Sequence, residues 1–125
     1  METKRLPDRP DATAPDGSDV RLLLRLGGGS MAHFELPAGR TSHAVAHRTV
    51  EELWYFLRGR GEMWRSFEGL SEVVEVERDV CISIPVGTSF QFRALEGEPL
   101  AAVGVTMPPW PGPDEAVLVE GAWPS

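Results

Sequence analysis

The chain has 125 residues, of which 42% are hydrophobic and 25% are charged, and this balance fits one soluble globular domain. No apolar run approaches the ~20 residues of a membrane span, and a formal charge of −7 would repel a phosphate backbone. We therefore expect neither a membrane nor a nucleic-acid partner. The N-terminus lacks the apolar core of a secretory signal, which predicts a cytoplasmic protein.

The beginning of the chain and its one cysteine permit simple predictions. Residues 1–19 are rich in Pro and Asp and predict an irregular N-terminal arm. A single cysteine, Cys81, excludes an internal disulfide and a zinc site built from several cysteines. We expect Cys81 to be a core residue.

The middle of the chain, residues 20–107, has the pattern of an all-β domain. Short apolar or alternating runs are separated by turn signals such as GGG, PAG, PVG and EGEP. The runs lie at residues 20–26, 30–37, 43–47, 52–59, 61–67, 72–77, 80–86, 89–94 and 100–107. Their spacing near ten residues predicts a sandwich, barrel or jelly roll.

One of these runs also fits a helix. Its apolar residues recur at helical spacing, at Val50, Leu53, Trp54 and Leu57. The aromatic run 54–56 favours a strand instead, and RGRGE after it is typical of a hairpin turn that joins 52–59 to the next strand. We predict a strand here, followed by a hairpin.

The end of the chain, residues 108–125, differs from the middle. Its closely spaced prolines oppose regular strand pairing, so we predict an extended Pro/Trp-rich strap that packs on the barrel.

Two segments together resemble the motifs of a known family. Gly39, His47, Glu52 and Gly59 fall at the spacing of the first motif of the cupin superfamily, and Pro85 and Gly87 in IPVGTSF resemble its second motif. The resemblance covers roughly residues 20–107. It implies a double-stranded β-helix, or jelly-roll barrel, whose mouth holds a metal on three His and one Glu.

Two of the four ligand positions that the resemblance implies carry other residues. His47 and Glu52 match the family, but Val45 and Phe90 occupy the other two positions. First-row metals in His and carboxylate sites usually need three or more protein ligands, so we expect no cofactor. The alternative is a divalent transition metal on His47, Glu52 and His43, although four residues of strand separate His43 from His47 by about 13 Å.

The same substitutions predict an apolar pocket. We expect Val45, Trp54, Phe90, Phe92 and His33 to line it, around His47 and Glu52 as an acid and base pair. The alternative is a purely structural role, in which His47 and Glu52 only satisfy each other's hydrogen bonds.

These residues favour a protein that binds a small organic molecule. One hypothesis is a metal-independent isomerase, cyclase or lyase that uses His47 and Glu52, and a dioxygenase is disfavoured. The alternatives are a non-catalytic ligand-binding or sensor cupin, whose tail near Trp110 closes over the ligand, and a metal-dependent enzyme with an irregular site. Small cupins commonly pair through one sheet, so the resemblance also implies a homodimer.

Overall fold

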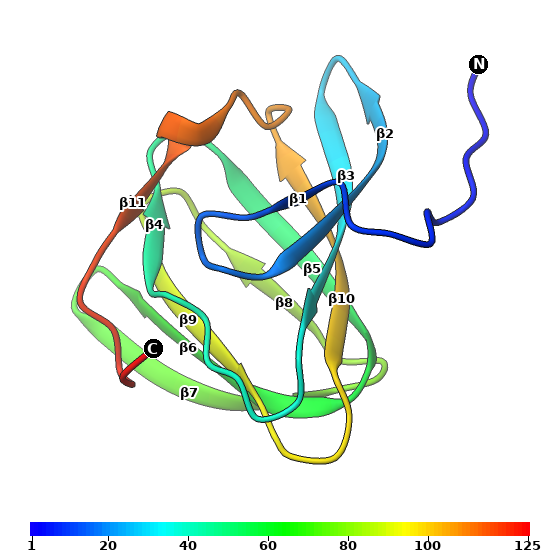
Figure 1. Cartoon of the computed structure of the whole chain (residues 1–125). Helices are drawn as coiled ribbons and strands as arrows, with labels where there is room; N and C mark the ends of the chain where they lie inside the picture. Colours follow the sequence, from blue (N-terminus) through cyan, green and yellow to red (C-terminus); the bar gives the residue numbers. More distant parts are fainter.

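Two antiparallel β-sheets face each other and form a barrel, as the computed structural model of all 125 residues shows (Figure 1). One sheet has six strands in the order β1-β2-β3-β10-β5-β8, and the other has five in the order β11-β4-β9-β6-β7. The strands are β1 (Ala12–Thr13), β2 (Asp19–Leu26), β3 (Gly29–Leu36), β4 (Val45–His47), β5 (Glu51–Arg58), β6 (Arg60–Phe67), β7 (Leu70–Glu77), β8 (Cys81–Ile84), β9 (Ser89–Ala94), β10 (Leu100–Met107) and β11 (Ala116–Leu118).

The nine strands predicted between residues 20 and 107 are all confirmed. Residues 51–58 are strand β5, because the side chains of Glu52, Trp54 and Phe56 alternate into the barrel while their neighbours face outward. The helical spacing of the apolar residues in this segment is therefore coincidental.

The predicted hairpin after β5 is wrong. Strand β5 pairs with β10 and β8, whereas β6 pairs with β7 and β9 in the other sheet. Gly59 makes this change of sheet with a φ of +79°, and an added Cβ would lie 2.2 Å from the Pro99 carbonyl oxygen. Gly59 therefore marks a crossing between the sheets. A hairpin turn would also have favoured a glycine with positive φ at this position.

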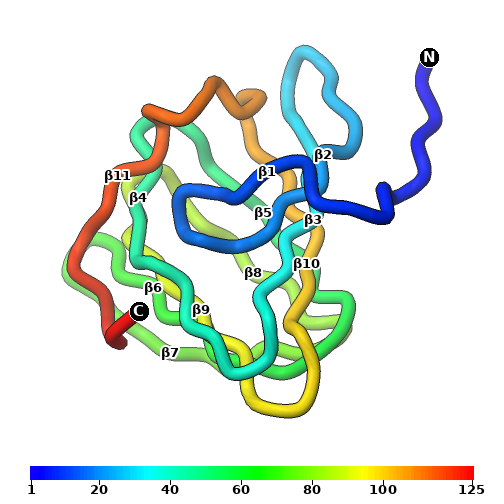
Figure 2. The backbone as a smooth tube through the Cα atoms, in the orientation of Figure 1, coloured from blue at the N-terminus to red at the C-terminus, as the bar shows by residue number.

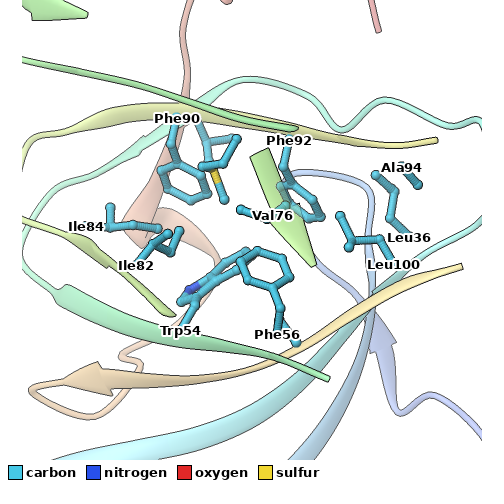
Figure 3. Packing of buried hydrophobic residues seen from close by; sticks show 13 residues of the cluster. Leu36, Trp54, Phe56, Val76, Ile82, Ile84, Phe90, Phe92, Ala94 and Leu100 are labelled. Carbon is cyan, nitrogen blue, oxygen red and sulfur yellow. The ribbon is translucent and has the colours of Figure 1, made fainter. Parts of the chain in front are cut away.

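The hydrophobic core fills the space between the two sheets. A cluster of 13 buried residues includes Trp54, Phe56, Phe90 and Phe92, and Figure 3 shows these rings facing one another between the sheets. Full burial of each such ring stabilises the fold by about 2–3 kcal/mol. Cys81 is not part of this cluster: it is exposed, because strand β8 turns Ile82 and Ile84 inward and Cys81 outward. The expectation that Cys81 lies in the core is wrong.

Both ends of the chain return to the barrel. Near the N-terminus, β1 pairs with β2, and the tube in Figure 2 shows this segment crossing the open end of the barrel. Beyond the prolines, β11 pairs with β4, so the tail does form a regular strand that its composition did not predict. The one helix, a 3-10 turn at Pro113–Glu115, is far too short to cross a membrane.

Candidate functional site

His47 and Glu52 come from different sheets and meet at the mouth of the barrel. His47 is the last residue of β4 in the five-stranded sheet, and Glu52 is the second residue of β5 in the six-stranded sheet. The short connection 48–50 brings the two strands together, and strand alternation turns both side chains inward.

The two side chains form a buried pair. His47 Nδ1 lies 3.0 Å from Glu52 Oε2, and the residues are 8% and 3% exposed. This is an ion-pair distance, but the alignment is too poor for a hydrogen bond, and neither atom has another hydrogen-bond partner in the chain. Buried polar atoms that lack a hydrogen bond are costly, so the stability of the fold does not by itself explain this pair.

The pair borders a cavity of about 850 Å³, a volume typical of small-molecule sites. Val45, Trp54 and Phe90 line it, as do Phe34 and Trp110. The His47 ring makes edge contacts with Phe90 and Trp110, with ring centroids 5.2 and 5.0 Å apart. These contacts fix the imidazole plane against an apolar wall.

One wall of the cavity depends on a glycine. Phe34 and Trp54 stack with centroids 4.9 Å apart, on strands that lie on either side of β10. Gly104 of β10 stands between them, and a Cβ there would approach Phe34 to 2.8 Å and Trp54 to 3.0 Å. A larger residue at position 104 would therefore push this aromatic pair apart.

A pair of hydroxyl groups lies beside Glu52. Across three neighbouring strands, Thr106 is opposite both Ser30 and Glu52. Ser30 Oγ and Thr106 Oγ1 are 2.5 Å apart, and the Trp110 backbone N–H donates to Ser30 Oγ at 2.9 Å. The cavity thus combines an apolar body with a polar end.

Asp16 is a further acidic residue of this cavity, which the sequence patterns did not reveal. It lines the cavity from the loop between β1 and β2 and is 5% exposed. Burial is the largest influence and raises the pKa of Asp16 above its ordinary value of 3.8, with a smaller contribution from the Glu52 charge. Hydrogen bonds from Ser18 and the His47 charge oppose the rise. No motif marks Asp16, and only the folding of the N-terminal segment over the mouth places it there.

Glu115 of the C-terminal strap holds the connection between His47 and Glu52. Its carboxylate accepts the Thr49 N–H at 2.6 Å, the Thr49 hydroxyl and the Val50 N–H at 3.3 Å. Burial opposes ionisation of Glu115, but these bonds and a contact with the Arg48 backbone lower its pKa below the ordinary 4.5. Glu115 is therefore a clamp on the turn that positions the pair.

Three predicted site residues lie elsewhere. Phe92 belongs to the core and makes an edge contact with Trp54 at 5.2 Å, so it does not line the cavity. His33 is buried on β3 next to Arg21 of β2, while its neighbours Ala32 and Phe34 line the cavity. The placement of both residues in the pocket is corrected, because depth in the barrel and strand alternation decide which side chains reach it.

His43 is also separated from the pair. It precedes β4, is exposed, and its Nδ1 lies 2.9 Å from the Ser125 hydroxyl. The predicted metal set of His47, Glu52 and His43 is therefore not assembled.

The residues present do not fit the family's metal site. The side chains of Val45 and Phe90 occupy two of the four ligand positions and are each 1% exposed. Nowhere in the chain are three or more His, Cys, Asp or Glu side chains gathered as metal ligands. His47 Nδ1 faces the Glu52 carboxylate directly, so these two residues are arranged toward each other.

Comparison with known proteins agrees with the fold. No family model matches the chain. The uncharacterized protein MJ1618 of Methanocaldococcus jannaschii is 31% identical over 108 residues, which are 82% of this chain and 83% of that protein.

Solved structures extend the similarity. An uncharacterized conserved protein with a double-stranded beta-helix domain from Klebsiella pneumoniae has a TM-score of 0.68 at 16% identity, over 90% of both chains. The cupin domain of Cnp3 from Schizosaccharomyces pombe has a TM-score of 0.66 at 12% identity, over 78% of this chain and 69% of that one. With its two facing antiparallel sheets and these neighbours, the chain has the double-stranded β-helix fold that cupin domains share.

Proposed function

We propose that this protein binds a small carbonyl compound with an apolar body, and that His47 and Glu52 move a proton on it. The observation that carries the proposal is the buried pair, with His47 Nδ1 3.0 Å from Glu52 Oε2 at the wall of an apolar cavity. The reaction class is an isomerisation or a related cyclisation or elimination that is neutral in redox terms.

The proposal gives each member of the pair a role. Glu52 orients the imidazole and stabilises its positive charge when it is protonated. Because Nδ1 faces Glu52, Nε2 is the nitrogen left for a molecule in the cavity. His47 Nε2 takes a proton from the carbon next to the carbonyl, and the C–H electron pair becomes the C=C bond of an enolate. Where the substrate has a C=C bond at its β,γ position, the enolate is a dienolate. Return of the proton to its γ-carbon gives the α,β-unsaturated carbonyl compound, so the double bond shifts without a co-reactant.

The apolar walls support this chemistry in a second way. Val45 and Phe90 exclude water from the imidazole, and Trp54 and Phe34 offer flat surfaces for an unsaturated or aromatic body. Electrostatic interactions are stronger in such surroundings than in water, so the Glu52 carboxylate stabilises the positive charge of the protonated His47 ring more strongly there.

Deuterium exchange tests the proposal without knowledge of the natural substrate. In D₂O, the wild-type protein should exchange the α-protons of 2-tetralone, an apolar enolisable ketone, faster than buffer alone, as followed by proton NMR. We expect His47→Ala and Glu52→Gln each to lower the protein-dependent rate about 100-fold, as loss of a general base does.

Two variants serve as matched controls. His43→Ala removes an exposed histidine outside the cavity, and Glu51→Gln makes the same chemical change at the exposed neighbour of Glu52. Both should exchange at the wild-type rate. If binding of the ketone quenches the tryptophan fluorescence of the wild type while the ketone's α-protons exchange no faster than in buffer, the catalytic proposal is wrong. In that case the protein is a binding module.

A further inference from the structure

Asp16 belongs to a loop that is fastened over the cavity. The Ala14 N–H donates a hydrogen bond to the Ser18 carbonyl at 2.8 Å, and the Gly17 N–H donates to the Ala14 carbonyl at 2.9 Å. The His43 backbone N–H donates to the Asp16 carbonyl at 2.7 Å, which ties the loop to the barrel. These bonds hold the loop in place, and with it the Asp16 side chain at the cavity wall.

The two carboxyl oxygens of Asp16 have different surroundings. Oδ1 accepts the Ser18 N–H at 2.9 Å and the Ser18 hydroxyl at 2.6 Å. Oδ2 has no hydrogen bond within the chain, although the residue is 95% buried, and no Lys or Arg forms an ion pair with this carboxyl group. Oδ2 is therefore the oxygen left for a molecule in the cavity.

Burial, more than the charged groups around it, favours the neutral form of Asp16. Glu52 faces it as a second carboxylate and His47 as a possible cation, while Arg25 lines the exposed part of the cavity and donates to the Trp110 carbonyl at 3.5 Å. Burial and the Glu52 charge together raise the pKa of Asp16. A protonated carboxyl group carries an O–H donor, which a carboxylate lacks.

We propose that Asp16 is a third functional group of the cavity, and that its Oδ2 donates a hydrogen bond to the carbonyl oxygen of the bound molecule. This inference rests on the proposed function, because it assigns the oxygen end of the same ligand. As His47 removes the carbon proton, negative charge develops on the carbonyl oxygen, and the Asp16 O–H stabilises it there. The substrate class is thereby narrowed to uncharged carbonyl compounds, since Glu52 would repel a carboxylate.

A comparison of two ligands isolates this hydrogen bond. 2-Tetralone and tetralin share a ring skeleton, but only 2-tetralone has a carbonyl oxygen, and binding of both can be followed by the fluorescence of Trp54 and Trp110, which line the cavity. The wild type should prefer the ketone by about 5- to 10-fold, the usual worth of one hydrogen bond. Asp16→Ala should lose this preference, whereas Asp16→Asn should keep it, because an amide also donates.

The controls separate this inference from the proposed function. Asp19→Ala makes the same chemical change as Asp16→Ala, but outside the cavity lining, and should keep the preference. A wild type that prefers the ketone without exchanging its protons would overturn the proposed catalysis but support the role of Asp16. An Asp16→Ala protein with wild-type melting temperature and undiminished preference would overturn the role of Asp16.

The pH dependence provides a readout that does not require the alanine variant to fold. In the wild type the preference should fall as pH rises through the pKa of Asp16, because the carboxylate no longer donates. In Asp16→Asn it should not change over the same range. A wild-type preference that is as insensitive to pH as that of Asp16→Asn would contradict the inference.

Discussion

The contribution of Asp16 to the stability of the folded protein depends on pH. A buried carboxyl group whose pKa is raised favours the folded state when it is protonated. That contribution is complete below the unfolded value of 3.8 and is lost as pH rises through the raised folded value. Above this window the folded protein holds a buried carboxylate that forms no ion pair with Lys or Arg, which lowers its stability. Functional residues often reduce stability in this way.

Replacement by asparagine should reverse this cost. We expect Asp16→Asn to melt at a higher temperature than the wild type at pH 8, by roughly 2–5 °C, because the amide keeps the Ser18 contacts without a charge. Near pH 4 the two proteins should melt together. Calorimetry at both pH values measures the difference, and a variant that is destabilised equally at both would show that burial does not govern this carboxyl group.

At the scale of single residues, spacing identified the pair but not its surroundings. His47 and Glu52 could be placed together from the motif, because two short strands joined by a tight turn fix their separation. Phe92 could not be assigned, since both the core and the cavity take aromatic side chains from β9. Asp16 could not be found, because its position depends on long-range contacts such as the His43 N–H bond.

Among the elements, the connection between β4 and β5 depends on the C-terminal strap. Glu115 is 5% exposed and takes hydrogen bonds from Thr49 and Val50, the residues that separate His47 from β5. Glu115 therefore supports the turn that positions the pair, although it does not itself line the cavity.

We expect Glu115→Gln to lower the free energy of unfolding by ~1–2 kcal/mol at pH 7, the cost of weakening charge-assisted hydrogen bonds. Since the pKa of Glu115 is lowered, its stabilising contribution is present above 4.5 and is lost as pH falls through the folded value. The difference between the two proteins in urea unfolding should therefore shrink at low pH.

Glu120→Gln is a matched control, because it changes an exposed carboxylate on the same strap. It should unfold like the wild type at every pH. A Glu115→Gln protein with unchanged stability and unchanged ketone exchange would show that the strap does not support the turn.

Strands were easier to predict than their connections. Alternation and turn residues located each strand between residues 20 and 107, because a pleated strand turns every second side chain inward. The change of sheet at Gly59 was misread as a hairpin, since both need a glycine with positive φ. β11 was missed because the prolines precede it rather than interrupt it.

For the whole molecule, the homodimer stays a prediction. The outer face of β5 exposes Leu53, Tyr55 and Leu57, with exposed fractions of 55%, 46% and 39%. Val103 and Val105 lie opposite Tyr55 and Leu53 on β10 and widen this apolar face. A second copy that covers it would bury a continuous patch, as oligomers of identical chains do.

Light scattering after size exclusion measures the assembly. We expect twice the chain mass of 13.7 kDa for the wild type and the single mass for Leu53→Glu. Leu70→Glu, which introduces the same charge at an exposed position on the other sheet, should leave the assembly unchanged. A wild-type mass near 13.7 kDa would contradict the dimer.

The barrel, the N-terminal loop and the C-terminal strap together line one cavity, and we propose that the buried pair is its reactive centre. The most direct test is a double-mutant cycle of His47→Ala and Glu52→Gln in the 2-tetralone exchange assay. We expect each single change to remove most of the protein-dependent rate and the double change to lose no more than the larger single loss, because the pair acts as one unit. Losses that multiply in the double variant, or a wild-type rate equal to those of the single variants, would contradict a catalytic pair.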